Sequence, residues 1–347
     1  MQFLFHYDRS RISWHTALAL LLMGMLLLVG CENTSPAPQK SSVPTPRATA
    51  TPDPGKITEF PVNALLAGLT AGPDGAIWFT EQYGVAKGIG RITSQGQISE
   101  FATPTYNSLP QGITSGPDGA LWFTELAIDK IGRITVQGQF TEFATPTHDS
   151  LPEEITSGPD GALWFTEFTG NKIGRITTQG QISEFTLPTS NSSPDAITAG
   201  PDGTLWFTEF KGNKIGRITT QGQISEFTLP TPGSQPNRIT AGPDGALWFT
   251  AKKMSKIGRI TVQGQFSEYP IPAPGNAPAF GITAGPDGAL WFSSDRYGLL
   301  GRITTQGKIT EFPDAMPADI TSGPDGTLWF TESSNKIGRL VLQPASS

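Results

Sequence analysis

The decapeptide GPDGALWFTE occupies residues 116–125 and returns unchanged at residues 158–167. Its first four letters recur along the chain, each time followed within four residues by a Trp-Phe pair. The seven copies begin at Gly72, Gly116, Gly158, Gly200, Gly242, Gly285 and Gly323. They lie roughly 42 residues apart, a spacing typical of propeller blades built from four short strands. We therefore predict an all-β fold, a seven-bladed β-propeller of four-stranded blades.

Within one repeat, strands and tight turns alternate. In the third copy Asp160-Gly161 suits a hairpin turn, because both residue types tolerate positive φ, and Gln179-Gly180 marks a second turn. Apolar residues show no helical period anywhere in the unit. The expected strands are residues 155–157, 162–167, 173–177 and 181–185.

One tryptophan stands at the same place in every copy: Trp78, Trp122, Trp164, Trp206, Trp248, Trp291 and Trp329. A blade cannot bury both of its faces alone, so neighbouring blades must cover them. We interpret the tryptophans as packing residues between blades; the alternative is a row of rings on which sugars or bases stack.

The two ends of the repeated region complement each other. It begins with an outer-strand phrase, ITEF at 57–60, and ends with a third-strand phrase, KIGRL at 336–340. The N-terminal strand should therefore complete the last blade and close the ring.

Composition agrees with one large β domain. The chain has 347 residues, 37% of them hydrophobic, with 40 Gly and 30 Pro, as expected for many strands and turns. A net charge of -6 gives no reason to expect a nucleic-acid partner. We expect a monomer.

The N-terminal segment resembles an export signal. Arg9 and Arg11 precede an apolar run at 17–29, which is short for a membrane span, and the only cysteine, Cys31, follows at once. This pattern resembles a bacterial lipoprotein signal; the alternative is an uncleaved anchor with an incidental cysteine. We predict a signal peptide at 1–30, a lipid on Cys31, a Pro/Ser/Thr-rich tether at 31–55, the propeller at 56–342 and a tail at 343–347. The predicted location is the bacterial cell envelope, where the lipid anchors an exported domain to a membrane.

Two sets of side chains are candidates for a site on the face that carries the longer loops. The first set ends the second strands: Glu81, Glu125, Glu167, Glu209 and Glu332, replaced by Ala251 and Ser294 in blades five and six. Five carboxylates around a channel mouth could hold a divalent cation. The alternative is that each pairs with a repeated cation such as Lys172 or Arg175.

The second set lies just before each first strand, where the copies disagree. These residues are Gln111, Glu153, Glu154, Asp195, Asn237, Arg238, Phe280, Ala318 and Asp319. Positions that vary within a constant frame can serve a ligand, although they can also simply be unconstrained. Blades five and six depart most from the repeat, at 252–254, at 270–278, and at Asp295, Arg296 and Tyr297. We take Glu153, Asp195, Asn237, Arg238, Phe280, Asp295, Arg296 and Tyr297 as candidate contacts for a small-molecule or peptide ligand.

The phrases GPDGALWFTE, NKIGRIT and ISEFTLPT, repeated over 56–342, resemble the virginiamycin B lyase (streptogramin lyase) family. The resemblance covers the whole predicted propeller and implies a seven-bladed fold. It also implies a magnesium-dependent elimination that opens a cyclic depsipeptide antibiotic, with histidine as the base. Mg²⁺, or Ca²⁺ in its place, is thus implied by resemblance alone.

The residues that the resemblance would make catalytic are missing here. The family's two histidine positions correspond to Phe280 and Ala318, neither of which can accept a proton, and its last carboxylate position corresponds to Ser333, beside Glu332. His148, the one histidine after the signal, lies in the link between blades two and three. Three functions stay open: a binding propeller, a streptogramin-type lyase with another base such as Glu153 or Tyr297, and a metal-assisted lactone hydrolase.

Overall fold

The computed structural model describes residues 55–84, 88–253, 255–272, 279–294, 298–313 and 316–342. The predicted signal, Cys31, most of the tether and the tail lie outside these residues. Among the described residues no helix is long and apolar enough to cross a membrane.

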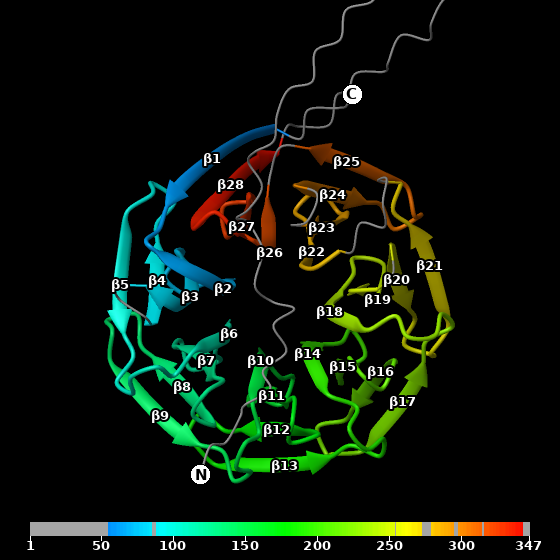
Figure 1. The fold of residues 1–347 in the computed structure, drawn as a ribbon, viewed down its shortest axis with the longest axis horizontal. Helices are drawn as coiled ribbons and strands as arrows, with labels where there is room; N and C mark the ends of the chain where they lie inside the picture. Colours follow the sequence, from blue (N-terminus) through cyan, green and yellow to red (C-terminus); the bar gives the residue numbers. More distant parts are fainter. Residues whose placement is uncertain are drawn as a thin grey trace, which may run out of the picture. The chain divides into compact units, whose positions relative to one another are not determined.

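The described chain forms seven antiparallel four-stranded sheets arranged around a common centre (Figure 1). Blades one to three, each from the centre outward, are β2 (Ala64–Ala71), β3 (Ile77–Gly84), β4 (Gly88–Ile92) and β5 (Ile98–Ala102); β6 (Pro110–Ser115), β7 (Leu121–Glu125), β8 (Lys130–Ile134) and β9 (Phe140–Ala144); β10 (Pro152–Ser157), β11 (Leu163–Glu167), β12 (Lys172–Ile176) and β13 (Ile182–Thr186).

Blades four to seven follow the same order. They are β14 (Pro194–Ala199), β15 (Leu205–Glu209), β16 (Lys214–Ile218) and β17 (Ile224–Thr228); β18 (Pro236–Ala241), β19 (Leu247–Ala251), β20 (Lys256–Ile260) and β21 (Phe266–Pro270); β22 (Ile282–Ala284), β23 (Leu290–Ser294), β24 (Leu299–Ile303) and β25 (Ile309–Pro313); β26 (Pro317–Ser322), β27 (Leu328–Glu332), β28 (Lys336–Leu342) and β1 (Gly55–Pro61). The predicted all-β seven-bladed propeller is confirmed.

The repeated tryptophans join each blade to the next. Trp206 of blade four is fully buried among Ile239, Leu247 and Phe249 of blade five. On its own blade its indole stacks on Phe227 of the outer strand, with ring centroids 5.6 Å apart. All seven tryptophans are at most 2% exposed, which confirms the packing role and excludes a surface stacking platform.

In six of the seven blades the Pro-Asp-Gly turn is tied to the tryptophan that follows it, and the exception is Trp329, whose indole N–H has no partner. In blade three the Trp164 indole donates to Asp160 Oδ1 over 3.0 Å, and Arg175 Nε donates to Oδ2 over 2.7 Å. The guanidinium also lies over the indole, 5.9 Å from its centre. Burial acts to raise the pKa of Asp160, but these two donors outweigh it and hold the pKa below its ordinary value. The turn and the indole of the decapeptide thus form one hydrogen-bonded unit with the arginine of the third strand.

The glycine of the third-strand phrase has a packing reason. Gly174 lies opposite Phe165 in the register of β11 and β12. A Cβ at residue 174 would lie 2.1 Å from the Phe165 ring. Only glycine lets this ring lie flat across the strand.

The ring closes through strands from opposite ends of the chain. β1 pairs with β28 in antiparallel register, with Phe60 opposite Ile337 and Gly55 opposite Leu342. Phe60 stacks on Trp329 at 5.8 Å, and Trp329 packs in turn against Phe79 of blade one. The predicted closure is confirmed, and β1 already includes Gly55, which the sequence had assigned to the tether.

The inner strands differ from the prediction at their starts. β10 begins at Pro152 and not at residue 155, because Pro152 pairs with Glu167 before the register shifts and resumes at Ile155. The same irregularity precedes Ile113, Ile197, Ile239 and Ile320. Such a shift redirects side chains locally, and it falls on the residues that vary between copies.

Truncating one indole tests the role of these contacts. We expect Trp206→Ala to lower the free energy of unfolding by roughly 3–5 kcal/mol, because the change removes a fully buried aromatic and leaves a cavity between two blades. Urea unfolding measures the loss. Tyr106→Ala, at a side chain 76% exposed, is the matched aromatic control and should change stability by less than about 1 kcal/mol. Equal losses would contradict the packing role.

Candidate functional site

The variable residues meet where the inner strands begin. Each inner strand starts at the end of the blade where the second strand finishes, as Pro152 opposite Glu167 illustrates. The loops after the second strands and the links between blades lie on this same face. The opposite end of each blade carries the Pro-Asp-Gly turn, which is the same in all copies.

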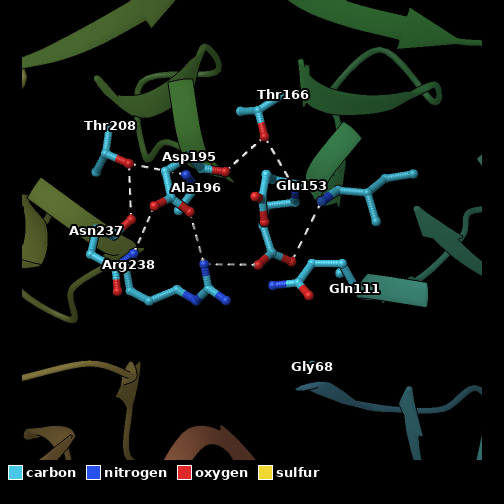
Figure 2. Close-up of polar contacts among 12 residues, drawn as sticks. Gly68, Gln111, Glu153, Thr166, Asp195, Ala196, Thr208, Asn237 and Arg238 are labelled. Atoms are coloured by element: carbon cyan, nitrogen blue, oxygen red, sulfur yellow. Dashed lines mark hydrogen bonds and ion pairs between the residues drawn. The ribbon is translucent and has the colours of Figure 1, made fainter. Parts of the chain in front are cut away.

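Threonines of the second strands fix the backbone at these variable positions. Thr166 Oγ1 donates to the Asp195 carbonyl of the next blade over 2.7 Å and accepts from Glu154 N over 3.1 Å. Thr208 makes the corresponding contacts with Asn237 O and Ala196 N (Figure 2). These bonds use only main-chain atoms of the variable residues, so their side chains can change without altering the frame.

A polar cluster joins blades three, four and five near the centre of the ring. Arg238 Nη1 lies 3.3 Å from Asp195 Oδ1 (Figure 2). The same atom lies 3.5 Å from Glu154 Oε2. Asn237 donates from Nδ2 to Asp195 Oδ2 over 2.8 Å. Asp195 is 1% exposed. Its two carboxylate oxygens accept hydrogen bonds from Asn237 and Arg238 of blade five. One guanidinium therefore ties together carboxylates from two other blades.

The cluster holds more acids than bases. Burial raises the pKa of Glu154 to about 7; Arg238 opposes this shift, and Asp319 of blade seven adds to it. Burial also raises the pKa of Asp319, again against the effect of Arg238. The single positive charge of Arg238 cannot neutralise all of these carboxylates, so protonation of the acids lowers the remaining negative charge.

Glycine makes room for this cluster. A Cβ at Gly112 of blade two would lie 2.7 Å from Glu154 Oε1 and 2.8 Å from Glu153 O. The Glu154 side chain therefore covers the neighbouring inner strand, and only a residue without a side chain fits beneath it.

The other candidate contacts have mixed outcomes. Gln111 and Glu153 are buried, and the Gln82 amide donates to the Gln111 side-chain oxygen. Phe280 is half-buried, and its carbonyl accepts from Thr250 Oγ1 over 2.6 Å. Asp295, Arg296 and Tyr297 lie outside the described residues. The structure thus brings Glu154, Asp195, Asn237 and Arg238 into one cluster and leaves the blade-six contacts as predictions.

The second-strand glutamates are buried. Glu81, Glu125, Glu167 and Glu209 are fully buried and Glu332 is 5% exposed, and a ring of these carboxylates at a channel mouth stays a prediction. The alternative, an ion pair with Lys172 or Arg175, is not formed by Glu167, because Lys172 binds Glu184 of the outer strand at 2.6 Å and Arg175 binds Asp160 at 2.7 Å. The register places Glu167 directly opposite Lys172, so it is the choice of Glu184 by the ammonium group that leaves Glu167 without an ion pair.

These buried glutamates are held largely without partners. The carboxylate oxygens of Glu81 have no hydrogen-bonding partner. Contacts of Glu125 with Ser108 and of Glu209 with Ser192 offset the effect of burial only in part. Burial raises their pKa values to about 7, and to about 8 for Glu167, where Glu184 adds to the shift. A buried carboxyl group without a partner is less costly when it is neutral.

The metal ion implied by resemblance does not fit the described residues. Among them no group of three or more His, Cys, Asp or Glu side chains could hold a metal ion. Each of the second-strand glutamates lies in a different blade. The Ser334 hydroxyl donates a 2.9 Å hydrogen bond to Glu332 Oε2.

Sequence reasoning missed two features of this face. It placed Glu154 and Asp319 among the variable residues but did not connect them to Arg238, since their strands are far apart in sequence. It also passed over Phe168, Phe210 and Lys211, which follow the second strands of blades three and four. The sequence did contain an indication of these residues, because the loop after the second strand differs between copies that are otherwise nearly identical.

Comparison with known proteins agrees with this architecture. The model of the virginiamycin B lyase family matches residues 47–241 and 229–345. A solved streptogramin B lyase structure is 41% identical with a TM-score of 0.79, covering 83% of this chain and 98% of its own. Virginiamycin B lyase from Staphylococcus aureus is 43% identical with a TM-score of 0.78, covering 83% and 99%. A catalytically inactive His-to-Ala variant of that enzyme, solved with quinupristin, matches equally well. Comparison with curated proteins gives no match.

Removing the central cation tests the polar cluster. We expect Arg238→Gln to lower the free energy of unfolding by about 1–3 kcal/mol, because Asp195 and Glu154 lose their common partner while remaining mostly buried. Adding Asp195→Asn should restore part of the loss, and chemical unfolding of the four chains gives the coupling. Lys308→Gln, on the opposite face, should stay within about 0.5 kcal/mol. Additive effects of Arg238→Gln and Asp195→Asn would contradict the proposed contact.

The buried glutamates predict a pH dependence. A carboxyl group whose pKa rises on folding binds its proton more tightly in the folded chain. Stability is therefore fully present below about pH 4.5 and is lost as pH rises towards 8 for Glu167. Glu167→Gln should flatten the stability curve between pH 5 and pH 8 by on the order of 1–3 kcal/mol. Thermal unfolding across this range measures it, and parallel curves for the two chains would refute the assignment.

Proposed function

The chain belongs to the virginiamycin B lyase family, and we propose that it is a binding propeller of that family rather than a lyase. One observation carries the proposal. At the two positions that resemblance assigns to histidine, Phe280 and Ala318, the side chains offer no proton acceptor while the backbone keeps its role in the frame: Phe280 O accepts from Thr250, and Ala318 O accepts from Gly281 N over 3.2 Å.

No other imidazole of the described residues stands near this place. His148 is exposed in the link before blade three. The lyase alternative would need another base, and Glu153, proposed from the sequence, is 6% exposed at the start of its inner strand. Glu154, with its pKa near 7, already contacts Arg238. These surroundings favour a structural role for both acids.

The proposed ligand site is the face where the inner strands begin. Its frame is constant, because threonine side chains bind main-chain atoms there, and its side chains differ from blade to blade. Such a division suits recognition of a small molecule or a peptide. We further propose that the chain is exported and anchored through a lipid on Cys31, as its N-terminal segment suggests. A metal-assisted lactone hydrolase is less well supported, because the described residues contain no group of His, Cys, Asp or Glu side chains that could hold a metal ion.

A direct assay separates binding from catalysis. Incubation of the chain with a type B streptogramin and Mg²⁺, followed by mass spectrometry, should give no linear product under conditions where a family lyase converts its substrate completely. Calorimetry on the same mixture tests whether the intact antibiotic binds. Rapid ring opening by the natural chain would overturn the proposal.

A double variant tests why activity is expected to be missing. Phe280→His together with Ala318→His restores imidazole at both positions; each single variant and a Phe280→Leu, Ala318→Ser chain are the controls. Any gain of linear product should appear in the double variant alone, because a base needs a pKa near the working pH. Activity in the control chain would assign the chemistry to other residues.

A further inference from the structure

A constant loop frame carries changing side chains on the proposed binding face. In blades two to five, the first two residues after the second strand donate their N–H groups to two carbonyls of the preceding link. In blade three Phe168 N binds Leu151 O at 3.0 Å and Thr169 N binds Ser150 O at 3.1 Å, and in blade four Phe210 N and Lys211 N make the same bonds at 2.9 Å. Lys252 and Lys253 repeat them in blade five, both at 3.0 Å.

The side chains on this frame change steadily around the ring. The two loop positions hold Leu126 and Ala127 in blade two, then Phe168 and Thr169, then Phe210 and Lys211, and finally Lys252 and Lys253 in blade five. The loop conformation does not require these differences, since its hydrogen bonds use only main-chain atoms. The gradient runs from apolar through aromatic to cationic.

Four of these residues contact one another across the blade boundaries. Phe168 and Phe210 lie with ring centroids 6.2 Å apart at 48°. Lys211 Nζ lies 5.7 Å from the centre of the Phe168 ring, and Lys252 Nζ lies 5.2 Å from that of Phe210. We call Phe168, Phe210, Lys211 and Lys252 the rim strip. Both rings are half-buried and Lys211 is exposed.

We propose that the rim strip binds a ligand that combines an aromatic ring with an anionic group, such as an aromatic carboxylate. This inference rests on the proposed binding function and names the ligand class. A ring of the ligand would lie against Phe168 and Phe210, and its anion would meet the two ammonium groups, each of which carries several donors.

Charge supports this choice of ligand. The whole chain carries -6, so cations gathered on one rim oppose its general charge. The residues that directly precede the loops offset this charge only in part, because Glu167 and Glu209 are fully buried with raised pKa values and Ala251 stands at the same place before Lys252. A cationic ligand would be repelled here and attracted elsewhere on the molecule.

The cation–π contacts could also serve packing alone, and a pair of probes distinguishes the two roles. The probes are 2-naphthoate and its neutral counterpart 2-naphthamide, which share one ring system and differ in charge. Calorimetric titration of the full-length chain should show naphthoate binding about tenfold more tightly, and raised salt should reduce the ratio. Equal affinity for the two probes, or binding of neither, would overturn the proposal.

Matched variants place the probe on the strip. Lys211→Gln with Lys252→Gln should abolish the preference for naphthoate while naphthamide binding stays the same. Phe168→Leu should weaken both probes. Lys308→Gln removes an exposed cation on the opposite face and should change neither. A preference that survives the double lysine variant, with thermal unfolding unchanged, would place the anion elsewhere.

The outcome is independent of the assay for catalysis. Ring opening of a streptogramin would overturn the proposed non-catalytic function, yet the naphthoate-to-naphthamide ratio and its loss in the double variant would still stand or fall with the rim strip. Absence of both ring opening and naphthoate preference would leave the proposed function in place and remove only this ligand class.

Discussion

Burial of one indole between each pair of blades is the contact on which the rest of the structure depends. A single blade leaves both faces apolar, and Trp206 fills the space that Ile239, Leu247 and Phe249 of the next blade enclose. The indole N–H needs a partner in this dry position, and the Asp202 carboxylate of the preceding turn supplies it at 3.1 Å. Turn and indole therefore occur together in every copy, and six of the seven indoles donate to the aspartate of their turn; in blade seven Asp325 accepts from Thr327 instead, and the Trp329 N–H has no partner.

The same contact separates what must stay constant from what is free to change. Packing and turn chemistry use the end of each blade that carries Pro-Asp-Gly, while the other end is tied by threonine hydroxyls and loop N–H groups to main-chain atoms. A main-chain partner is available from any residue type. Side chains such as Asp195 and Arg238 can consequently differ from their counterparts in other blades without loss of the ring, and differences between the blades accumulate at that end.

The repeat made the fold predictable, and the exceptions to it were less so. Seven copies of one phrase specify strands, turns, closure by β1 and the role of each tryptophan, because every copy faces the same packing problem. The burial of Glu167 without an ion pair could not be predicted in this way, since Glu167 lies opposite Lys172 in the register and yet Lys172 binds Glu184. The cluster around Arg238 was also hidden, because Glu154 and Asp319 lie far away in sequence and converge only when the ring closes.

Changes of side chain at Phe280 and Ala318 are easily tolerated in such an architecture. The structural task of Phe280 is performed by its carbonyl, which binds Thr250, and that of Ala318 by a carbonyl that binds Gly281 N. Neither task constrains the side chain, so imidazole can be gained or lost at these positions while the blades keep their register. Close similarity in fold and in repeated phrases therefore reports on the frame. Activity depends on a few side chains that the frame does not select, and these must be tested one position at a time.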